Sequence, residues 1–543
     1  MANLQSSDFH RGIYEKIGTS GITEAGTTTP VIGPDSLDTT DNTNGVGEYG
    51  SYVNSVSQIT STYTTAGKHV IFMTEGTHSY PEPKAVVATV TGDAILYGTR
   101  VDTSGNPSSH YDSSKGTSIA YDAANGKVLI SHGTNNNHGN YMVVGTISGD
   151  SISFGSVATV DSGSTPHDNS MRPQGMVYVG GIGGDTTNRL VLANKHNSNH
   201  QGHARVITIS GTTPTAHTVA SWHTTNEPKD FCMAYVGGGQ VVIAYAASNG
   251  ALNAKVGTVA GGGTNTITWG SAVSLASTNS NYNQLAIAYD EQNSKVLIAL
   301  VSTTANTRGR YIGATVSGTG AGGTLTFSGA PEFETSGTCT ALSAEYHAGA
   351  QKILISYKSA GNASPQVIAA TYSGTSGSQV TYTFGTAVPL MSASTPLMTT
   401  TSYDAVNKKV IVFRDGAVGY KHGLAVDLLT STLTLDLSTG NYFSADMQSN
   451  GTSNIGTFTL SNTNAVSGQA QDFQLKVIQG SIPRQFTWSG MSNIKWNSYY
   501  QPGIGQIHRP TISTGNDAVD IFSFTTFDNG TTWYGNIVGQ DFS

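Results

Sequence analysis

Short apolar runs alternate with polar turns along most of this chain, and the pattern predicts β structure. One clear set of four runs comprises residues 116–122, 127–133, 141–149 and 152–160. Runs such as KVLIA (295–299) and KILIS (352–356) lack the polar alternate of a half-exposed strand. Continuous apolar runs are typical of strands that are covered on both faces. We therefore expect four-stranded sheets that are stacked against one another.

A tyrosine closes the first run of seven such sets. These residues are Tyr63, Tyr121, Tyr178, Tyr235, Tyr289, Tyr346 and Tyr403, at intervals of 58, 57, 57, 54, 57 and 57 residues. A fixed period of this size indicates that one supersecondary unit is repeated. Radially arranged four-stranded blades cover both faces of their inner strands, and propellers have ~4 to 8 blades. The sequence predicts an all-β fold with a seven-bladed β-propeller over residues 45–431, in which the tyrosines pack at the ends of the innermost strands.

The two ends of the repeated region look complementary. The last copy supplies three clear strands, and residues 45–56 (GVGEYGSYVNSV) resemble the fourth runs SFGSVATV (153–160) and TWGSAVSL (268–275). We expect the segment 45–56 to close the ring against the seventh blade, which removes exposed sheet edges. An open solenoid is the alternative, but it needs atypical polar caps at both ends.

Beyond residue 431 the period stops and short alternating strands follow, which predicts a C-terminal β-sandwich or jelly roll over residues 432–543. Trp488, Trp496 and Trp533 are expected to anchor its core. The segment TFDNGTTW (526–533) resembles the Asp-box of sialidase-type propellers through Thr526, Asp528, Gly530, Thr532 and Trp533. Because it occurs once and outside the repeats, we interpret it as a hairpin signature and not as a sign of sialidase activity.

The connections on one face of the predicted disc are tight turns, whereas those on the other face are long and polar. The long ones are residues 103–116, 162–174, 194–203, 223–230 and 276–284. Long loops on a rigid scaffold are where binding usually resides, although they can also be plain solvated loops. Their neutral donors, acceptors and rings suit carbohydrate hydroxyls. The candidate ligand-binding residues are His132, His138, His196, His200, His203 and Tyr282.

Catalytic and metal chemistry find little support in the sequence. The loop histidines could hold a transition metal, but no carboxylate or cysteine recurs at ligand spacing, so we expect no metal and no cofactor. Asp112, Asp168, Glu227 and Asp230 lie on the predicted loop face, yet nothing in the sequence pairs them as a glycosidase requires. With no G-x-S-x-G elbow either, we expect no catalytic residues and no enzyme activity.

The composition of the chain limits the classes of molecule that we expect it to bind. The net charge is -8 and no basic run is present, which disfavours nucleic acid as a partner. No apolar stretch approaches the ~18 residues of a membrane span, and the N-terminus lacks the apolar core of a secretion signal, so we expect no membrane insertion. Cys232 and Cys339 belong to non-adjacent repeats, which predicts two free thiols.

Two sets of motifs resemble a known class of proteins. The strings LDLSTGNYF (435–443), DAVDIFSF (517–524) and DNGTTWYGNIVGQD (528–541) resemble the C-terminal module of tail-fibre and related virion structural proteins of bacteriophages, particularly marine phages. The blade repeats at 121–129, 289–297 and 403–411 resemble repeats in the same proteins. The resemblance covers about residues 60–543.

This resemblance implies a non-enzymatic virion protein, assembled in the host cytoplasm as a homo-oligomer, with a trimer favoured. The expected function is that of a tail fibre or receptor-binding protein whose partners are other virion proteins and a host surface polysaccharide. Residues 1–44 are then an extended arm for virion attachment. The alternatives are a head or tail decoration or adaptor protein with a purely structural role, or a propeller enzyme that cleaves glycans.

Overall fold

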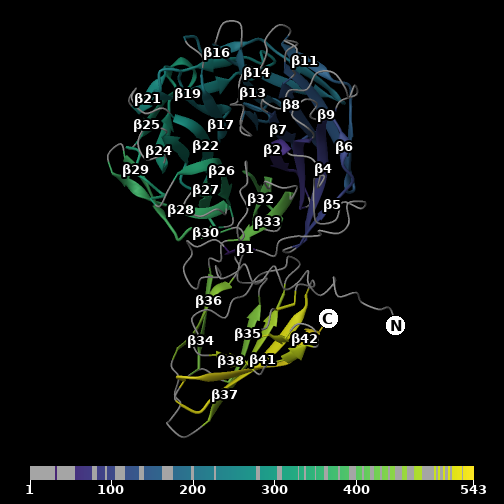
Figure 1. The fold of residues 1–543 in the computed structure, drawn as a ribbon, viewed down its shortest axis with the longest axis vertical. Helices are drawn as coiled ribbons and strands as arrows, with labels where there is room; N and C mark the ends of the chain where they lie inside the picture. The colour runs from purple at the N-terminus through teal and green to yellow at the C-terminus, as the bar shows by residue number, and fades with distance from the viewer. Residues whose placement is uncertain are drawn as a thin grey trace.

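The fold was analysed in a computed structural model. It describes residues 31–32, 56–65, 67–75, 82–91, 94–103, 117–133, 140–161, 175–196, 201–225, 228–276, 282–302, 308–327, 329–335, 338–348, 350–359, 365–376, 379–389, 399–406, 409–415, 421–427, 431–437, 441–446, 455–461, 470–479, 494–496, 499–501, 505–507, 512–513, 517–528 and 530–542. Seven antiparallel blades form a ring, and the C-terminal sheets lie to one side of it, beyond β1 and β33 (Figure 1). The predicted all-β propeller fold is confirmed.

Each blade is a meander whose first strand lies innermost. The strands of blades 1 to 3 are β2 (Val56–Tyr63), β3 (Lys68–Glu75), β4 (Glu82–Thr91), β5 (Ala94–Tyr97) and β6 (Val101–Asp102); β7 (Thr117–Asp122), β8 (Lys127–Gly133), β9 (Asn140–Ser148), β10 (Ser151–Phe154) and β11 (Ala158–Asp161); and β12 (Met176–Tyr178), β13 (Leu190–His196), β14 (Gln201–Ser210), β15 (Thr213–Ala216) and β16 (Ala220–His223). In each of these blades the fourth strand is split into two short segments, both of which pair with the third strand.

The remaining blades follow the same plan. The strands of blades 4 to 7 are β17 (Asp230–Gly237), β18 (Gln240–Ala246), β19 (Leu252–Val259), β20 (Ile267–Trp269) and β21 (Val273–Ala276); β22 (Tyr282–Asp290), β23 (Lys295–Ser302), β24 (Gly309–Ser317) and β25 (Thr324–Phe327); β26 (Cys339–His347), β27 (Lys352–Ser359), β28 (Pro365–Ser376), β29 (Gln379–Phe384) and β30 (Val388–Pro389); and β31 (Thr399–Asp404), β32 (Lys409–Asp415) and β33 (Lys421–Asp427). A short 3-10 helix, η1 (Gly320–Gly322), precedes β25.

A short strand from the N-terminal region pairs with blade 7. β1 (Val31–Ile32) pairs antiparallel with the end of β33, where Val31 lies opposite Asp427 and Ile32 opposite Val426. The sequence did not predict this pair of β-branched residues as part of the ring. Of the segment 45–56, Val56 begins β2 of blade 1 and residues 45–55 lie outside the described residues, so closure of the ring by that segment stays a prediction.

Apolar side chains fill the space between every two neighbouring blades. Seven hydrophobic clusters are present among the described residues of the propeller, one at each of the seven interfaces. The cluster between blades 7 and 1 joins Ile411 and Phe413 to Ile59 and Ile71, so the ring is closed by packing. Burial on both faces explains why the second strands have no polar alternate.

The C-terminal domain is a β-sandwich with a mixed sheet. Its strands are β34 (Ser431–Asp436), β35 (Tyr442–Asp446), β36 (Ile455–Ser461), β37 (Gln471–Ile478), β38 (Ile494–Trp496), β39 (Tyr499–Gln501), β40 (Gly505–Ile507), β41 (Val519–Thr526) and β42 (Trp533–Phe542). The main sheet has the order β35-β37-β41-β42-β38, and β34 pairs with β36 beside it. Leu435 of β34 shares one core with Phe473 and Phe522 of the main sheet. Three of the pairs, β34 with β36, β35 with β37 and β38 with β42, are parallel, which the sequence pattern did not reveal.

Trp533 is buried in this core and Trp496 packs against it, as expected, whereas Trp488 lies outside the described residues. The hairpin before Trp533 is held by Asp528, whose Oδ1 accepts hydrogen bonds from Thr526 Oγ1 at 2.9 Å and from the Thr532 backbone N–H at 2.8 Å. Gly530 has a φ of 78°, a value that favours glycine. The Asp-box-like segment is therefore a turn motif here.

Both cysteines are buried and free, as the sequence predicts. Among the described residues, no helix has the length and apolar character needed to cross a membrane.

Candidate functional site: the central channel

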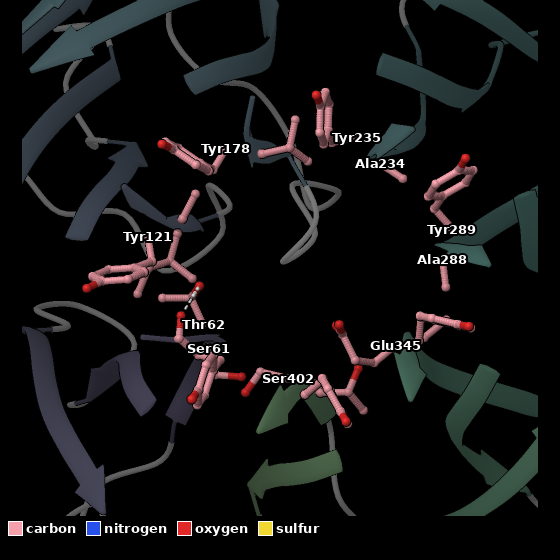
Figure 2. Close-up of a pocket in the computed structure, with 18 of the residues that line it drawn as sticks. Ser61, Thr62, Tyr121, Tyr178, Ala234, Tyr235, Ala288, Tyr289, Glu345 and Ser402 are labelled. Atoms are coloured by element: carbon pink, nitrogen blue, oxygen red, sulfur yellow. Dashed lines mark hydrogen bonds between the residues drawn. The ribbon is translucent and has the colours of Figure 1, made fainter. Parts of the chain in front are cut away.

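A channel of about 670 Å³ runs through the centre of the ring and is lined by the innermost strands of all seven blades (Figure 2). The seven periodic tyrosines all line it. The tyrosine period was used to count blades, and the structure shows that it also marks the wall of a cavity. Because each tyrosine lies within the last three residues of an innermost strand, the tyrosines encircle the channel near the tight turns that follow these strands.

The tyrosine hydroxyls serve the scaffold. In Figure 2 the hydroxyl groups of Tyr121, Tyr178, Tyr235 and Tyr289 point away from the channel. The hydroxyl of Tyr346 in blade 6 accepts a hydrogen bond from the backbone N–H of Gln292, in the first turn of blade 5, at 3.3 Å. This bond links blade 6 to blade 5, whereas the hydroxyls of Tyr178 and Tyr235 bond to residues of their own blades. A ligand in the channel therefore meets mainly the sides of the tyrosine rings.

The aspartates that follow three of these tyrosines also have structural roles. Asp122 Oδ1 accepts a hydrogen bond from the Asn125 backbone N–H at 3.1 Å, and Asp290 Oδ1 accepts one from the Asn293 N–H at 3.0 Å. Such contacts are typical of Asx-type turns. The repeated Tyr-Asp pair therefore builds the blade, and any specific chemistry must come from residues that depart from the repeat.

The channel lining has a polar side and an apolar side. Blades 6, 7 and 1 supply the polar residues Ser343, Glu345, Thr400, Thr401, Ser402, Ser61 and Thr62. Blades 2 to 5 supply the apolar residues Ile119, Ala120, Met176, Val177, Met233, Ala234, Ile287 and Ala288. No lysine or arginine is among the residues that line it.

Hydrogen bonds between blades organise the polar side. Ser61 Oγ and Thr400 Oγ1 are 3.2 Å apart, and Ser343 Oγ and Thr401 Oγ1 are 2.7 Å apart. These contacts join blade 1 to blade 7 and blade 7 to blade 6. The hydroxyls are therefore held in place before any ligand arrives, which lowers the entropic cost of binding.

Glu345 breaks the repeat. The residues that directly precede the seven tyrosines are Thr62, Ala120, Val177, Ala234, Ala288, Glu345 and Ser402. Six are small or neutral, and one is a carboxylic acid that reaches into the channel (Figure 2). No hydrogen bond joins the Glu345 carboxyl to another side chain or backbone group in the part of the chain that the structure describes. Its proton-binding group is thus available to a ligand.

A second carboxyl group lines the same channel. Glu291 lies in the first turn of blade 5, one residue beyond Asp290, where Ala123 and Ala405 stand in blades 2 and 7. Burial raises the pKa of Glu345 to about 8, and the charge of Glu291 adds to the effect. At neutral pH Glu345 is therefore mainly protonated and can donate a hydrogen bond to a ligand.

The residues singled out from the sequence lie elsewhere. His132 is buried between the rings of Phe72 and Tyr141, whose centroids are 6.1 and 6.2 Å from its own. His203 is also buried, and its carbonyl oxygen accepts the Trp222 indole N–H at 2.8 Å. Neither lines the channel.

His196 is the last residue of β13 and Tyr282 the first of β22, and their side chains lie outside the described residues, as do His138 and His200 entirely. Ligand binding by these six residues stays a prediction. Where the structure is described, no three His, Cys, Asp or Glu side chains are grouped so as to hold a metal ion.

Of the four loop-face acids, Asp230 has a structural role. It is buried, and its Oδ2 accepts a hydrogen bond from the Leu285 N–H of the next blade at 3.0 Å. Asp112, Asp168 and Glu227 lie outside the described residues. Glu345 was not among the residues predicted from the sequence, although an alignment of the seven copies at the tyrosine places it opposite small or neutral residues.

Comparison with known proteins yields structural likeness only. No protein-family model and no curated protein matches the sequence. Among solved structures, the lectin of Aleuria aurantia in complex with a fucose-containing disaccharide is 12% identical, with 64% of this chain and 98% of that chain covered and a TM-score of 0.36. The NanB sialidase of Streptococcus pneumoniae is 11% identical, with 72% and 71% covered and a TM-score of 0.41.

A third similar structure is the α-L-arabinanase of Penicillium chrysogenum, at 10% identity, with 58% of this chain and 93% of that chain covered and a TM-score of 0.34. At these values the likeness extends to the fold alone. It nevertheless corrects one prediction: the expectation that this chain is not an enzyme is wrong as an exclusion, because the similar folds include a sialidase and an arabinanase beside a lectin.

Proposed function

We propose that this protein binds carbohydrate and that one sugar unit occupies the central channel. The division of the channel lining carries the proposal. A sugar ring has hydroxyl groups along its edge and apolar C–H groups on its faces. The hydroxyls of Ser61 and Thr62 and the carboxyl of Glu345 suit the former, and the apolar wall of blades 2 to 5 suits the latter.

The volume of the channel, about 670 Å³, falls within the ~300 to 1,000 Å³ of typical small-molecule sites. A neutral ligand fits better than an anion, because no cation lines the channel and two carboxyl groups do. A protonated Glu345 can donate a hydrogen bond to a sugar oxygen, which the serine and threonine oxygens complement as acceptors.

A panel of neutral monosaccharides tested by saturation-transfer NMR on the full chain checks this function. We expect at least one sugar to bind and its affinity to fall at least tenfold in Glu345→Ala, the residue of blades 2, 4 and 5 at this position. Asp472→Ala, an exposed carboxylate of the C-terminal sheet, is the matched control. Failure of every sugar to bind, or equal binding by Glu345→Ala, contradicts the proposal.

The two carboxyl groups favour a second candidate function in the same channel, cleavage of the bound glycan. Glycoside hydrolysis uses one protonated carboxyl group, which gives its proton to the leaving oxygen, and one carboxylate that takes a proton from water or attacks the sugar. Glu345 suits the first role and Glu291 the second. Reducing ends released from an oligosaccharide by the wild type and not by Glu345→Gln support it, whereas binding without release leaves the lectin function.

The motifs of the C-terminal module and of the blade repeats, which resemble those of bacteriophage virion proteins, support a proposal about where the protein acts. We propose that the protein is a homo-oligomeric, trimeric part of a bacteriophage particle, as a tail fibre or receptor-binding protein that contacts host surface glycans and other virion proteins. Mass spectrometry of purified particles tests the location, and light scattering tests the trimer. A location against other subunits, away from the host-facing end, favours a decoration or adaptor role instead.

A further inference from the structure

A second cavity lies between the outer strands of blades 3 and 4. It measures about 450 Å³ and is lined from blade 3 by residues 218–221 and from blade 4 by Lys255 and residues 266–269. It is separate from the central channel, since the two share no lining residue. Its wall contains one cation, the indole of Trp269, and the hydroxyls of Thr218, Ser221 and Thr268.

Lys255 stands where five of the other six blades have an aliphatic residue. In every blade, the tyrosine pairs with a residue of the second strand. The second-strand residue two positions further along the chain pairs in turn with a residue of the third strand. These third-strand residues are Val86, Val143, Arg205, Lys255, Ile312, Ile368 and Leu424. Five are aliphatic, as the packing between blades requires. A lysine at this position loses part of the apolar packing that an aliphatic side chain provides. A binding role for its ammonium group would explain why a lysine stands there.

Several other cations of the repeat have partners inside the blades. Arg205 donates from Nη1 to the His217 carbonyl oxygen at 3.0 Å. Lys127 and Lys352 each donate from Nζ to a threonine hydroxyl on the neighbouring strand, at 2.7 and 3.0 Å. Lys255 makes no hydrogen bond or ion pair with any residue that the structure describes. Its ammonium group is half-buried in the wall of the cavity and has no acidic partner there.

Trp269 is held rigidly beside it. Its Nε1 donates to the Ala220 carbonyl oxygen of blade 3 at 3.3 Å, so the indole spans the two blades. The ring also lies over Gly257, where an added Cβ would come within 2.6 Å of Trp269 Cζ3. A half-buried and fixed aromatic ring offers stacking area at a low entropic cost.

We propose that this cavity binds a sugar that carries a carboxylate, as uronic acids do. The ammonium group of Lys255 pairs with the carboxylate, Trp269 packs against the sugar ring, and the hydroxyls of Thr218 and Ser221 bind the sugar hydroxyls. A single cation with no cluster of backbone N–H donors suits a singly charged carboxylate better than a phosphate. Burial lowers the pKa of Lys255, and an incoming carboxylate offsets the cost of keeping the ammonium charged.

Titration of the full chain with methyl β-glucuronide and methyl β-glucoside tests the site, because the two probes differ only in a carboxylate against a CH2OH group. We expect the glucuronide to bind at least tenfold more tightly than the glucoside. Lys255→Met keeps an apolar stem as in the aliphatic blades and should abolish this preference. Lys476→Met, on the exposed face of the C-terminal sheet, should retain it.

Three results overturn the proposal: equal binding of both probes by the wild type, an undiminished preference in Lys255→Met, or inorganic phosphate that binds at Lys255 while the glucuronide does not. Loss of the preference in Glu345→Ala with retention in Lys255→Met also overturns it, because that result places the ligand in the central channel. The outcome is independent of whether the channel binds a neutral sugar.

Discussion

The imidazole Nδ1 of His69 in blade 1 lies 2.6 Å from the hydroxyl oxygen of Ser402 in blade 7. Its other nitrogen, Nε2, lies 3.5 Å from Asp404 Oδ2, and all three side chains are buried. At the corresponding second-strand position the other blades have Val128, Leu190, Val241, Val296, Ile353 and Val410. The interface between the last and first blades therefore contains a polar contact that the other interfaces lack at this position.

This histidine should make stability depend on pH. Burial lowers the pKa of His69 below its ordinary value of 6.5, against the opposing effect of Asp404. The unfolded chain therefore takes up a proton at a higher pH than the folded chain. Above pH 6.5 the histidine is neutral in both states and its protonation costs no stability. Below pH 6.5 the free energy of unfolding falls by as much as ~1.4 kcal/mol per pH unit.

Urea unfolding of the wild type and of His69→Val at pH 7 and pH 5.5 measures this dependence. Valine is the residue of blades 2, 4, 5 and 7, so the variant retains the packing while it loses the titrating group. We expect the wild type to lose more stability than the variant on acidification. Equal losses would show that other groups are responsible.

The hydrogen bond that links Tyr346 to blade 5 should contribute measurably to stability. Tyr346→Phe removes the hydroxyl that accepts the hydrogen bond from the Gln292 N–H and leaves the ring in place. We expect the free energy of unfolding to fall by about 1 kcal/mol. Tyr289→Phe is the matched control, since the Tyr289 hydroxyl makes no hydrogen bond to a described residue. An equal loss in both variants would mean that the ring environment, and not the hydrogen bond, is responsible.

Glu345 should destabilise the fold at alkaline pH. Its pKa is about 8 in the folded chain against an ordinary 4.5, so the folded chain keeps this proton where the unfolded chain has lost it. Stability from this group is full below pH 4.5 and falls as the pH rises toward 8. We expect Glu345→Ala to be more stable than the wild type at pH 9 by ~1 kcal/mol or more. Thermal unfolding at pH 9 and pH 5 tests this, and a gain of the same size at both values would exclude ionisation as its cause.

Close packing in blade 3 should make the fold sensitive to substitution of Gly202. A Cβ on Gly202 would come within 2.3 Å of Trp222 Cε2, and Trp222 is fully buried. Gly202→Ala should therefore lower the free energy of unfolding by about 1–3 kcal/mol. Gly322→Ala serves as the control, because an added Cβ there has no neighbour within 4 Å, and it should change stability by less than about 0.5 kcal/mol. Chemical denaturation of both variants measures the difference, and a stable Gly202→Ala variant would show that the indole can move aside.

The repeat could be predicted from the sequence because every blade packs against a neighbouring blade on each of its two faces, so each copy needs the same apolar positions. Tyrosine spacing, continuous apolar second strands and Asn- or Gly-rich first turns all follow from that requirement. The closing strand was not readable, since the pairing of β1 with β33 depends on two residues that any strand could supply. Of segment 45–56, which has the fourth-strand pattern, only Val56 is described, and it begins β2 of blade 1.

The candidate sites were less accessible to prediction for a different reason. Loop histidines attracted attention through residue type, but His132 and His203 are buried in the described structure. Glu345 and Lys255 are inconspicuous in the linear sequence and become visible only when all seven copies are aligned on strand register. Departures from the repeat, rather than clusters of reactive residues, mark the candidate sites of this chain.

The pairing of β1 with β33 has a consequence for biosynthesis. Residues 31–32 leave the ribosome nearly four hundred residues before residues 421–427, with which they pair. During translation the early blades can stack in order, but the N-terminal segment must wait without its partner until blade 7 has emerged. The ring can therefore close only after blade 7 has been made. A chain that stalls before blade 7 exposes the apolar face of blade 1 that packs against blade 7, together with an unpaired β1.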